Sequence, residues 1–176
     1  MRKTRLLILL LCTVLLLSLL SGCFLRREKK RETAAYMHPA EQYVIALQNN
    51  DYAVLKSAVP LAVLLNSGLG SEELDARSRN MRAKYGDDLK ITIAETDSYP
   101  LSDELLKEFT DYLREEYQFN ANITEAYLIS GYLTLSGSLK KENSAGYFVS
   151  YCIAGTWYLD VDAYNALADL RTLIQK

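Results

Sequence analysis

Two long runs of alternating apolar and polar residues in the carboxy-terminal half place the strongest constraint on the fold. Residues 123–135 carry apolar side chains at most odd-numbered positions, and residues 147–161 repeat the pattern. A period of two over about a dozen residues is typical of a β-strand with one face in a core. The polar segment 136–146, rich in Ser, Lys, Asn and Gly, predicts a hairpin with a long tip between the two strands.

The rest of the chain has the pattern of helices around one further strand. Helical spacing of apolar residues predicts a helix that begins at Pro39, a second that begins at Tyr52 with Asp51 as its cap, and a third that Ser71 caps and Gly86 ends. Ser102 or Asp103 caps the next predicted helix, and Asp160 or Asp162 caps the last. Alternation around Ile91 predicts a strand that Pro100 closes. Helices first and antiparallel strands later predict an α+β fold. We expect amino-terminal helices packed on one face of a curved antiparallel sheet of three to four strands, with a carboxy-terminal helix.

The amino terminus has the features of an export signal. Three cationic side chains precede the uncharged apolar stretch 6–20, which is typical of a secretory signal peptide. Leu20-Ser21-Gly22-Cys23 follows and resembles the lipobox of bacterial lipoproteins. The resemblance implies that residues 1–22 are removed and that Cys23 carries a diacylglyceryl or palmitate-type lipid. Two acyl chains hold a protein at a membrane far better than one does, so no spanning helix is needed.

A retained transmembrane helix is the alternative interpretation. Residues 6–25 are uncharged and long enough to span a bilayer. The basic flank 26–32 favours a cytoplasmic position for the remainder of the chain. A spanning helix leaves the lipobox unexplained, so we prefer the lipoprotein interpretation. It predicts a cell-membrane location, lipid-anchored on the extracytoplasmic face, with residues 23–37 as a charged tether.

Charge and cysteine content bound the class of residues 38–176, which we expect to form a single α+β domain. This segment carries twelve basic and twenty acidic residues, a net charge of −8. Nucleic acid is therefore an unsuitable partner, because binding it needs clustered Lys and Arg. Cys152 is the one cysteine of the segment, so the segment holds no disulfide pair of its own. The hydrophobic core alone must stabilise the fold.

Three short sequences point to a known family. Asn50-Asp51-Tyr52 looks like a helix junction, residues 85–91 look like a helix end running into a strand, and Gly155-Thr156-Trp157-Tyr158 looks like a closing strand. They resemble the nuclear-transport-factor-2-like, or cystatin-like, α+β domains of small lipoproteins in Gram-positive bacteria. The resemblance covers roughly residues 39–161 and implies amino-terminal helices packed into a curved antiparallel sheet.

The titratable residues form no recognisable catalytic or metal-binding set in the sequence. His38 is the single histidine and lies at the domain boundary, and Cys152 has no visible cation to activate its thiol. We expect no cofactor and no metal. Predicted strand ends or turns, where water keeps a carboxylate ionised, hold Asp87, Asp88, Asp97, Asp160 and Asp162.

Thirteen tyrosines give the chain an unusual aromatic content. We expect Tyr127, Tyr147 and Tyr151 to pack in the core, with Tyr132 and Tyr158 on the other face of the sheet. The candidate pocket or aromatic face is formed by Tyr127, Tyr132, Tyr151, Trp157 and Tyr158.

These observations favour a non-enzymatic binding or interaction domain of the cell envelope, whose partner is an envelope protein or a small ligand. The resemblance implies one alternative, an isomerase or dehydratase that pairs a Tyr with an Asp in an apolar pocket. A structural envelope adaptor is another. A binding domain needs an apolar cavity with a few polar groups, and an enzyme also needs a titratable group of shifted pKa. An adaptor needs a filled core and an exposed apolar patch.

Overall fold

Four antiparallel strands form one sheet in the order β1-β2-β3-β4, so each strand pairs with its neighbour in the chain. The strands are β1 (Lys90–Pro100), β2 (Ile123–Ser136), β3 (Lys141–Ile153) and β4 (Thr156–Asp160). The structure, a computed structural model, describes residues 34–175. The predicted signal peptide and lipobox therefore lie outside the described residues.

Most helices precede the sheet, as the α+β prediction requires. They are η1 (Ala35–Met37), α2 (His38–Asn49), α3 (Tyr52–Ala58), α4 (Leu61–Asn66), α5 (Ser71–Tyr85), α6 (Asp103–Tyr117), α7 (Ala163–Ala166) and η2 (Asp169–Gln175). Two predicted caps are confirmed: the Asp51 carboxylate accepts hydrogen bonds from two backbone N–H groups at the start of α3, and the Ser102 hydroxyl accepts one at the start of α6. The predicted Ser71 cap is wrong, because Ser71 is the first residue of α5 and Gly70 holds the cap position. The carboxy-terminal helix is shorter than expected, because only one α-helical turn precedes the 3₁₀ segment η2.

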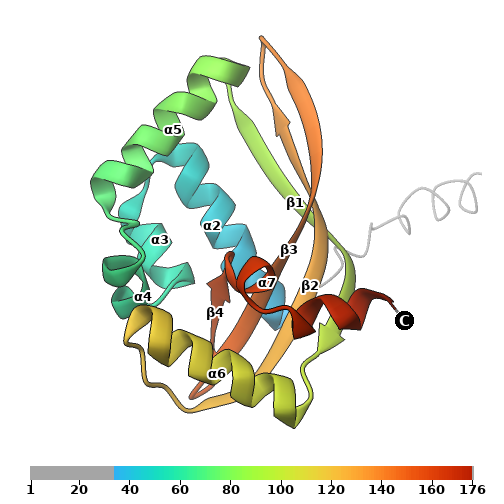
Figure 1. The fold of residues 1–176 in the computed structure, drawn as a ribbon. Helices are drawn as coiled ribbons and strands as arrows, with labels where there is room; N and C mark the ends of the chain where they lie inside the picture. Colours follow the sequence, from blue (N-terminus) through green and yellow to red (C-terminus); the bar gives the residue numbers. More distant parts are fainter. Residues whose placement is uncertain (1–33, 176) are drawn as a thin grey trace, which may run out of the picture. The chain divides into compact units, whose positions relative to one another are not determined.

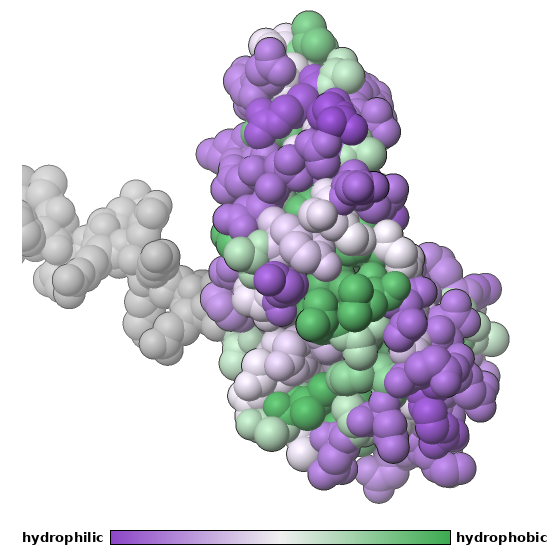
Figure 2. All heavy atoms as spheres, turned by 90° about the vertical axis from the view of Figure 1, so that its left-hand side faces the viewer, coloured by the Kyte–Doolittle hydropathy of each residue, from purple (hydrophilic) through white to green (hydrophobic). Residues whose placement is uncertain are grey.

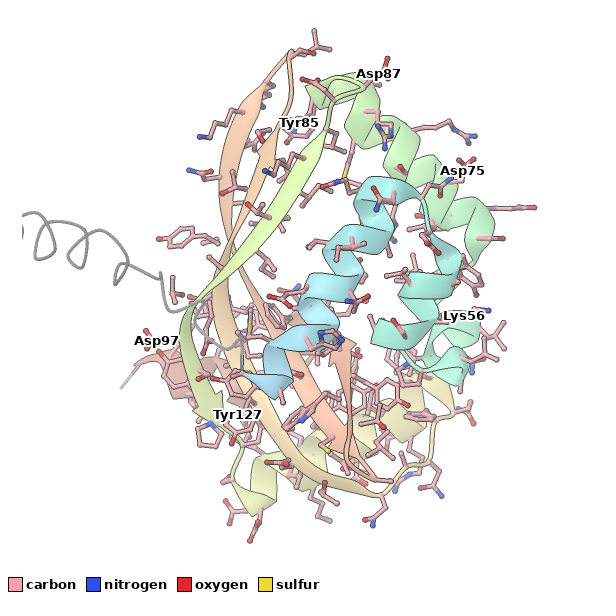
Figure 3. The ribbon with its side chains drawn as sticks, turned by 180° about the vertical axis from the view of Figure 1, so that it is seen from behind. Lys56, Asp75, Tyr85, Asp87, Asp97 and Tyr127 are labelled. Atoms are coloured by element: carbon pink, nitrogen blue, oxygen red, sulfur yellow. The ribbon has the colours of Figure 1, made fainter. Side chains whose placement is uncertain are left out.

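Helices cover both faces of the sheet, not one face as expected. In Figure 1, α6 and α7 lie in front of the sheet, and Figure 3 shows α2 on the opposite side. On the α6 face, the Phe109 ring meets Tyr151 edge-on at 5.2 Å, and the Tyr164 ring stacks on Tyr147 at 4.3 Å. Successive strand residues point to opposite faces, so Phe148 and Val149, both buried, belong to two different layers of the core.

The predicted strand 147–161 is in fact two strands. Ala154 and Gly155 both have positive φ (50° and 83°) and form a two-residue turn between β3 and β4. This is the turn geometry that suits the twist of a β-hairpin. Because the turn reverses the chain, Tyr151 pairs with Tyr158. The expectation that Tyr151 and Trp157 share a face is therefore wrong.

The tip of the β2–β3 hairpin is short, because β3 begins at Lys141 and not after Gly146. The tip packs on the junction of α5 and β1, where the carbonyl oxygen of Tyr85 accepts a hydrogen bond from the Leu139 backbone N–H (2.9 Å). A Cβ added at Gly137 would overlap that carbonyl oxygen. The hydroxyl of Tyr85, labelled in Figure 3, donates to Glu142 on β3 at 2.9 Å. These contacts fix the register of the hairpin.

Replacing Asp51 with Ala tests the contribution of the α3 cap. The carboxylate accepts from the backbone N–H groups of Ala53 (2.9 Å) and Val54 (3.1 Å), and both bonds are lost in the variant. We expect the free energy of unfolding, measured by urea titration, to fall by about 1 kcal/mol. Asp97→Ala is the matched control, since Asp97 is exposed on β1 and its loss should change little. Equal effects of the two substitutions would contradict this role of the cap.

Candidate functional site

An apolar pocket lies between α2 and the face of the sheet that this helix covers. Its volume is about 130 Å³. Helix α2 contributes Ala40, Tyr43, Val44 and Leu47, which share one face of the helix because their spacing follows its turn. The sheet contributes Ile93, Gly131, Leu133, Gly146, Tyr147, Phe148, Leu159 and Val161. We call this cavity the α2 pocket.

A pair of glycines creates the floor of the α2 pocket. Gly131 on β2 and Gly146 on β3 are direct partners across the two strands, so the sheet lacks two adjacent side chains beneath α2. Gly131 has a packing reason, because an added Cβ would lie 3.0 Å from the carbonyl oxygen of Ala94. Gly146 has none: an added Cβ would meet no heavy atom within 4 Å, and its φ is not positive. A side chain at Gly146 is absent although the backbone would accept one.

The mouth of the α2 pocket lies beside the open edge of β3. Strand β4 pairs with β3 only from Val149 to Ile153, so Gly146 lies beyond its end. Gly146 is exposed while Gly131 is buried. A group that enters past Gly146 therefore meets an apolar interior without displacing a strand.

A buried carboxylate lies next to this pocket, where sequence reasoning expected an exposed one. Asp160, the last residue of β4, retains only 4% of its surface exposure. One carboxylate oxygen accepts hydrogen bonds from the backbone N–H groups of Asp162 (2.9 Å) and Ala163 (2.7 Å), which orders the chain into α7. Burial raises the pKa of Asp160 to about 6, and these two hydrogen bonds limit the rise. The prediction that Asp160 lies in water is therefore wrong, although a pKa of about 6 leaves the carboxylate ionised at neutral pH.

Tyrosine hydroxyls surround this carboxylate on the α6 side of the sheet. The hydroxyl groups of Tyr112 and Tyr117 lie 2.9 Å apart, and the fully buried hydroxyl of Tyr151 has no hydrogen-bond partner among the described residues. Burial, with the charge of Asp160 as the next contribution, raises the pKa of Tyr117 to about 12 and that of Tyr112 further. The same two causes raise the pKa of Tyr151. These phenols stay neutral donors at physiological pH.

A second, smaller hollow lies at the outer edge of β4, and Asp160 forms part of its wall. We call this hollow the Asp160 chamber. Its volume is about 20 Å³, which is enough for one water molecule. Its lining is Tyr43, Val59, Val63, Ser67, Leu69, Tyr117, Leu159, Asp160, Val161 and Asp162.

The structure separates the aromatic residues that the sequence grouped as one candidate face. Tyr127 and Trp157 lie on the α2 face with their ring centroids 5.8 Å apart. The Tyr36 ring from η1 stacks on Tyr127 at 4.7 Å, and its hydroxyl contacts Glu95 (2.9 Å) and Ser98 (3.0 Å) on β1. We call this group the Tyr36 clamp. It holds the start of the described chain against the sheet.

The other predicted aromatic residues lie on the α6 face. The rings of Tyr151 and Tyr158 lie 6.0 Å apart, and Tyr151 is fully buried whereas Tyr132 is exposed. None of the five predicted residues lines the α2 pocket. Sequence reasoning missed the glycine pair and Asp160. The signals that could have found them were the two glycines at equal distances from the hairpin tip and an Asp between Leu159 and Val161.

The outer surface offers a smaller apolar feature. Leu61 and Leu65, one turn apart on α4, are 53% and 68% exposed. Figure 2, which faces the side carrying α3 to α5, shows apolar surface within a largely hydrophilic face. Within residues 34–175, no group of three His, Cys, Asp or Glu side chains is placed to hold a metal ion. No helix in this part of the chain is both long and apolar enough to cross a membrane.

Comparisons with models of known protein families, with curated proteins and with solved structures found no match.

The buried state of Asp160 predicts a specific pH dependence of stability. Its pKa is about 6 in the folded chain and 3.8 in its ordinary state, so the folded chain binds this proton more tightly. The resulting stabilisation is complete below about pH 4 and is lost as the pH rises through 6, a change of about 3 kcal/mol. Asp160→Asn removes it, because Asn does not titrate. Urea titrations of the two proteins at pH 4 and pH 7 measure the difference, and parallel pH profiles would contradict the assignment.

Proposed function

We propose that the chain is a bacterial lipoprotein whose domain binds a compact apolar group in the α2 pocket. In this proposal a diacylglyceryl group on Cys23 anchors the chain to the extracytoplasmic face of the cell membrane, and the nuclear-transport-factor-2-like domain meets a small ligand or an envelope protein there. The lipobox sequence and the basic, then apolar, amino terminus support the anchor. The glycine pair supports the binding site.

The observation that carries the binding proposal is the absence of a side chain at Gly146. Glycine within a strand costs stability, because it gains no packing and loses more conformational freedom than other residues. At Gly131 the close approach of β1 accounts for that cost. At Gly146 neither the backbone conformation nor a close neighbouring atom requires a glycine, so the cost in stability has no such explanation. We infer that Gly146 is a glycine because a side chain there would fill the α2 pocket.

The size of the pocket limits the group that it accepts. Complete sites for drug-sized ligands measure about 300–1,000 Å³, whereas the α2 pocket measures about 130 Å³. An apolar cavity of about 150 Å³ takes up benzene or xenon. The pocket therefore suits one aromatic ring or a short branched alkyl group, as a whole small ligand or as one part of a larger partner.

An enzyme of isomerase or dehydratase type is a second candidate, and the buried Asp160 favours it. Its raised pKa and the tyrosines beside it are features that acid–base catalysis uses. Two observations place this candidate second. Asp160 does not line the α2 pocket, and two backbone N–H groups already occupy one of its oxygens. The adaptor alternative requires a filled core, and the α2 pocket leaves part of the core open.

Filling the pocket from Gly146 tests the binding proposal. Toluene serves as the probe, and the methyl NMR signals of Val44 and Val161 report on the pocket walls in the full chain in lipid nanodiscs. We expect toluene to shift these signals in the wild type. In Gly146→Val the added methyl groups occupy the pocket, so we expect the affinity to fall at least about tenfold, the loss of about 1.4 kcal/mol of apolar contact. Valine also suits a strand, so the fold should be retained.

Ala145→Val is the matched control, because Ala145 is the next residue on β3 and its side chain points to the opposite face of the sheet. This variant adds more apolar surface to the same strand and should bind toluene as the wild type does. Unchanged toluene affinity in Gly146→Val, or no shift of the Val44 and Val161 signals in the wild type, would rule out the α2 pocket as the site.

Lipid attachment is tested separately. Cells of a bacterial host that express the full chain are grown with a labelled fatty acid, and the label on the protein is measured after gel separation. We expect labelled protein in the membrane fraction, and we expect Cys23→Ala to lose the label because it lacks the acceptor thiol. Cys12→Ala is the control, since Cys12 lies within the predicted signal peptide. Label retained by Cys23→Ala would contradict the anchor.

A further inference from the structure

The α2 pocket and the Asp160 chamber are neighbours with a common wall. Tyr43, Leu159 and Val161 line both hollows. Leu159 and Val161 flank Asp160 in the chain, and alternation turns their side chains toward α2 while Asp160 turns away. Of the three shared residues, only Tyr43 comes from α2 and not from β4 or the residue after it, so its side chain separates the two hollows on the helix side. A ligand in the α2 pocket therefore lies one side chain away from the Asp160 chamber.

The two hollows differ in chemistry. The α2 pocket has an almost wholly apolar wall, whereas the wall of the Asp160 chamber is mainly apolar but includes the polar residues Asp160, Asp162 and Tyr117. The chamber holds about one non-hydrogen atom of a guest, since its volume of about 20 Å³ matches one water. An apolar pocket beside a one-atom hollow whose wall includes a buried carboxylate fits a molecule with a compact apolar body and one polar end.

The charge around the chamber selects the kind of polar end. No Lys or Arg among the described residues forms an ion pair with Asp160 or Asp162. Arg77 on α5 acts on the Tyr43 hydroxyl and is itself paired with Glu73 at 2.7 Å. A carboxylate in a low-dielectric surrounding attracts a hydrogen-bond donor strongly and repels an anion.

We propose that the α2 pocket and the Asp160 chamber are two subsites of one binding site for a compact apolar molecule that carries a hydrogen-bond donor. The apolar body occupies the α2 pocket, and the ammonium or hydroxyl group displaces the Tyr43 side chain and bonds to Asp160 and Tyr117. This inference rests on the proposed function, because it needs the α2 pocket to bind a ligand. It adds the chemical class of that ligand.

Four probes that share one ring test this class: toluene, benzyl alcohol, benzylamine and benzoate. The full chain in lipid nanodiscs is titrated with each at pH 7.5. The methyl NMR signals of Val44 and Val161 report binding, and the free probe concentration is corrected for partition into lipid. We expect benzylamine or benzyl alcohol to bind at least about tenfold more tightly than toluene, as a hydrogen bond to a charged group predicts. We expect benzoate to bind more weakly than toluene.

Asp160→Asn tests the residue that makes the selection. Asparagine keeps a carbonyl oxygen for the N–H groups of Asp162 and Ala163, so the turn into α7 is retained. We expect this variant to bind toluene as the wild type does and to lose most of the preference for the donor probes. Asp97→Asn removes an equal charge from exposed β1 and should leave the preference unchanged. Tyr117→Phe, which removes the other polar group, should weaken the preference in part.

Three results separate this inference from the proposed function. Equal affinities for toluene, benzylamine and benzyl alcohol, with Gly146→Val still blocking toluene, would overturn the donor class and leave the pocket intact. A donor preference that survives in Asp160→Asn would overturn the role of the chamber. No shift with any probe would overturn both proposals together.

Discussion

Both faces of the β2–β3 hairpin are buried in the half that lies away from its tip, and the rest of the fold depends on this double burial. Ile129 and Phe148 pack beneath α2, while their strand neighbours Leu128 and Val149 pack beneath α6. A slip of one residue in the register would exchange the two sets. The hairpin tip prevents such a slip, because it is fixed to Tyr85 at the end of α5. The register in turn sets Gly131 opposite Gly146.

The proposed function rests on a local exception within this well-packed arrangement. Where most positions on the two buried faces carry large side chains, the glycine pair leaves a hollow beneath α2. Nearby on β4, Asp160 is a second exception, because its carboxylate is buried among apolar side chains. Proteins accept such costs more readily at sites that bind or react than elsewhere. The adjacency of an apolar hollow and a buried charge is the basis for treating them as one site.

Local signals in the sequence predicted much of the fold, and long-range contacts account for what was missed. Asp51 and Gly86 mark helix boundaries by local chemistry, so they were predicted correctly. The two-residue turn at Ala154 and Gly155 exchanges which residues share a face, so alternation alone grouped Tyr151 with Trp157 wrongly. The burial of Asp160 depends on α4, α6 and α7 meeting at the edge of β4, which no local pattern encodes. The glycine pair required the register, which depends on the length of the hairpin tip.

The Tyr36 clamp has a mechanical consequence. Tyr36 lies near the start of the described chain and connects to Tyr127 by stacking and to Glu95 and Ser98 through its hydroxyl. Any pulling force that arrives through the preceding residues reaches these contacts before it reaches α2. Because the clamp transfers the force to β1 and β2 together, less of it reaches α2, the helix that covers the α2 pocket. A force applied at the amino-terminal end of the domain thus leaves the geometry of the α2 pocket unchanged.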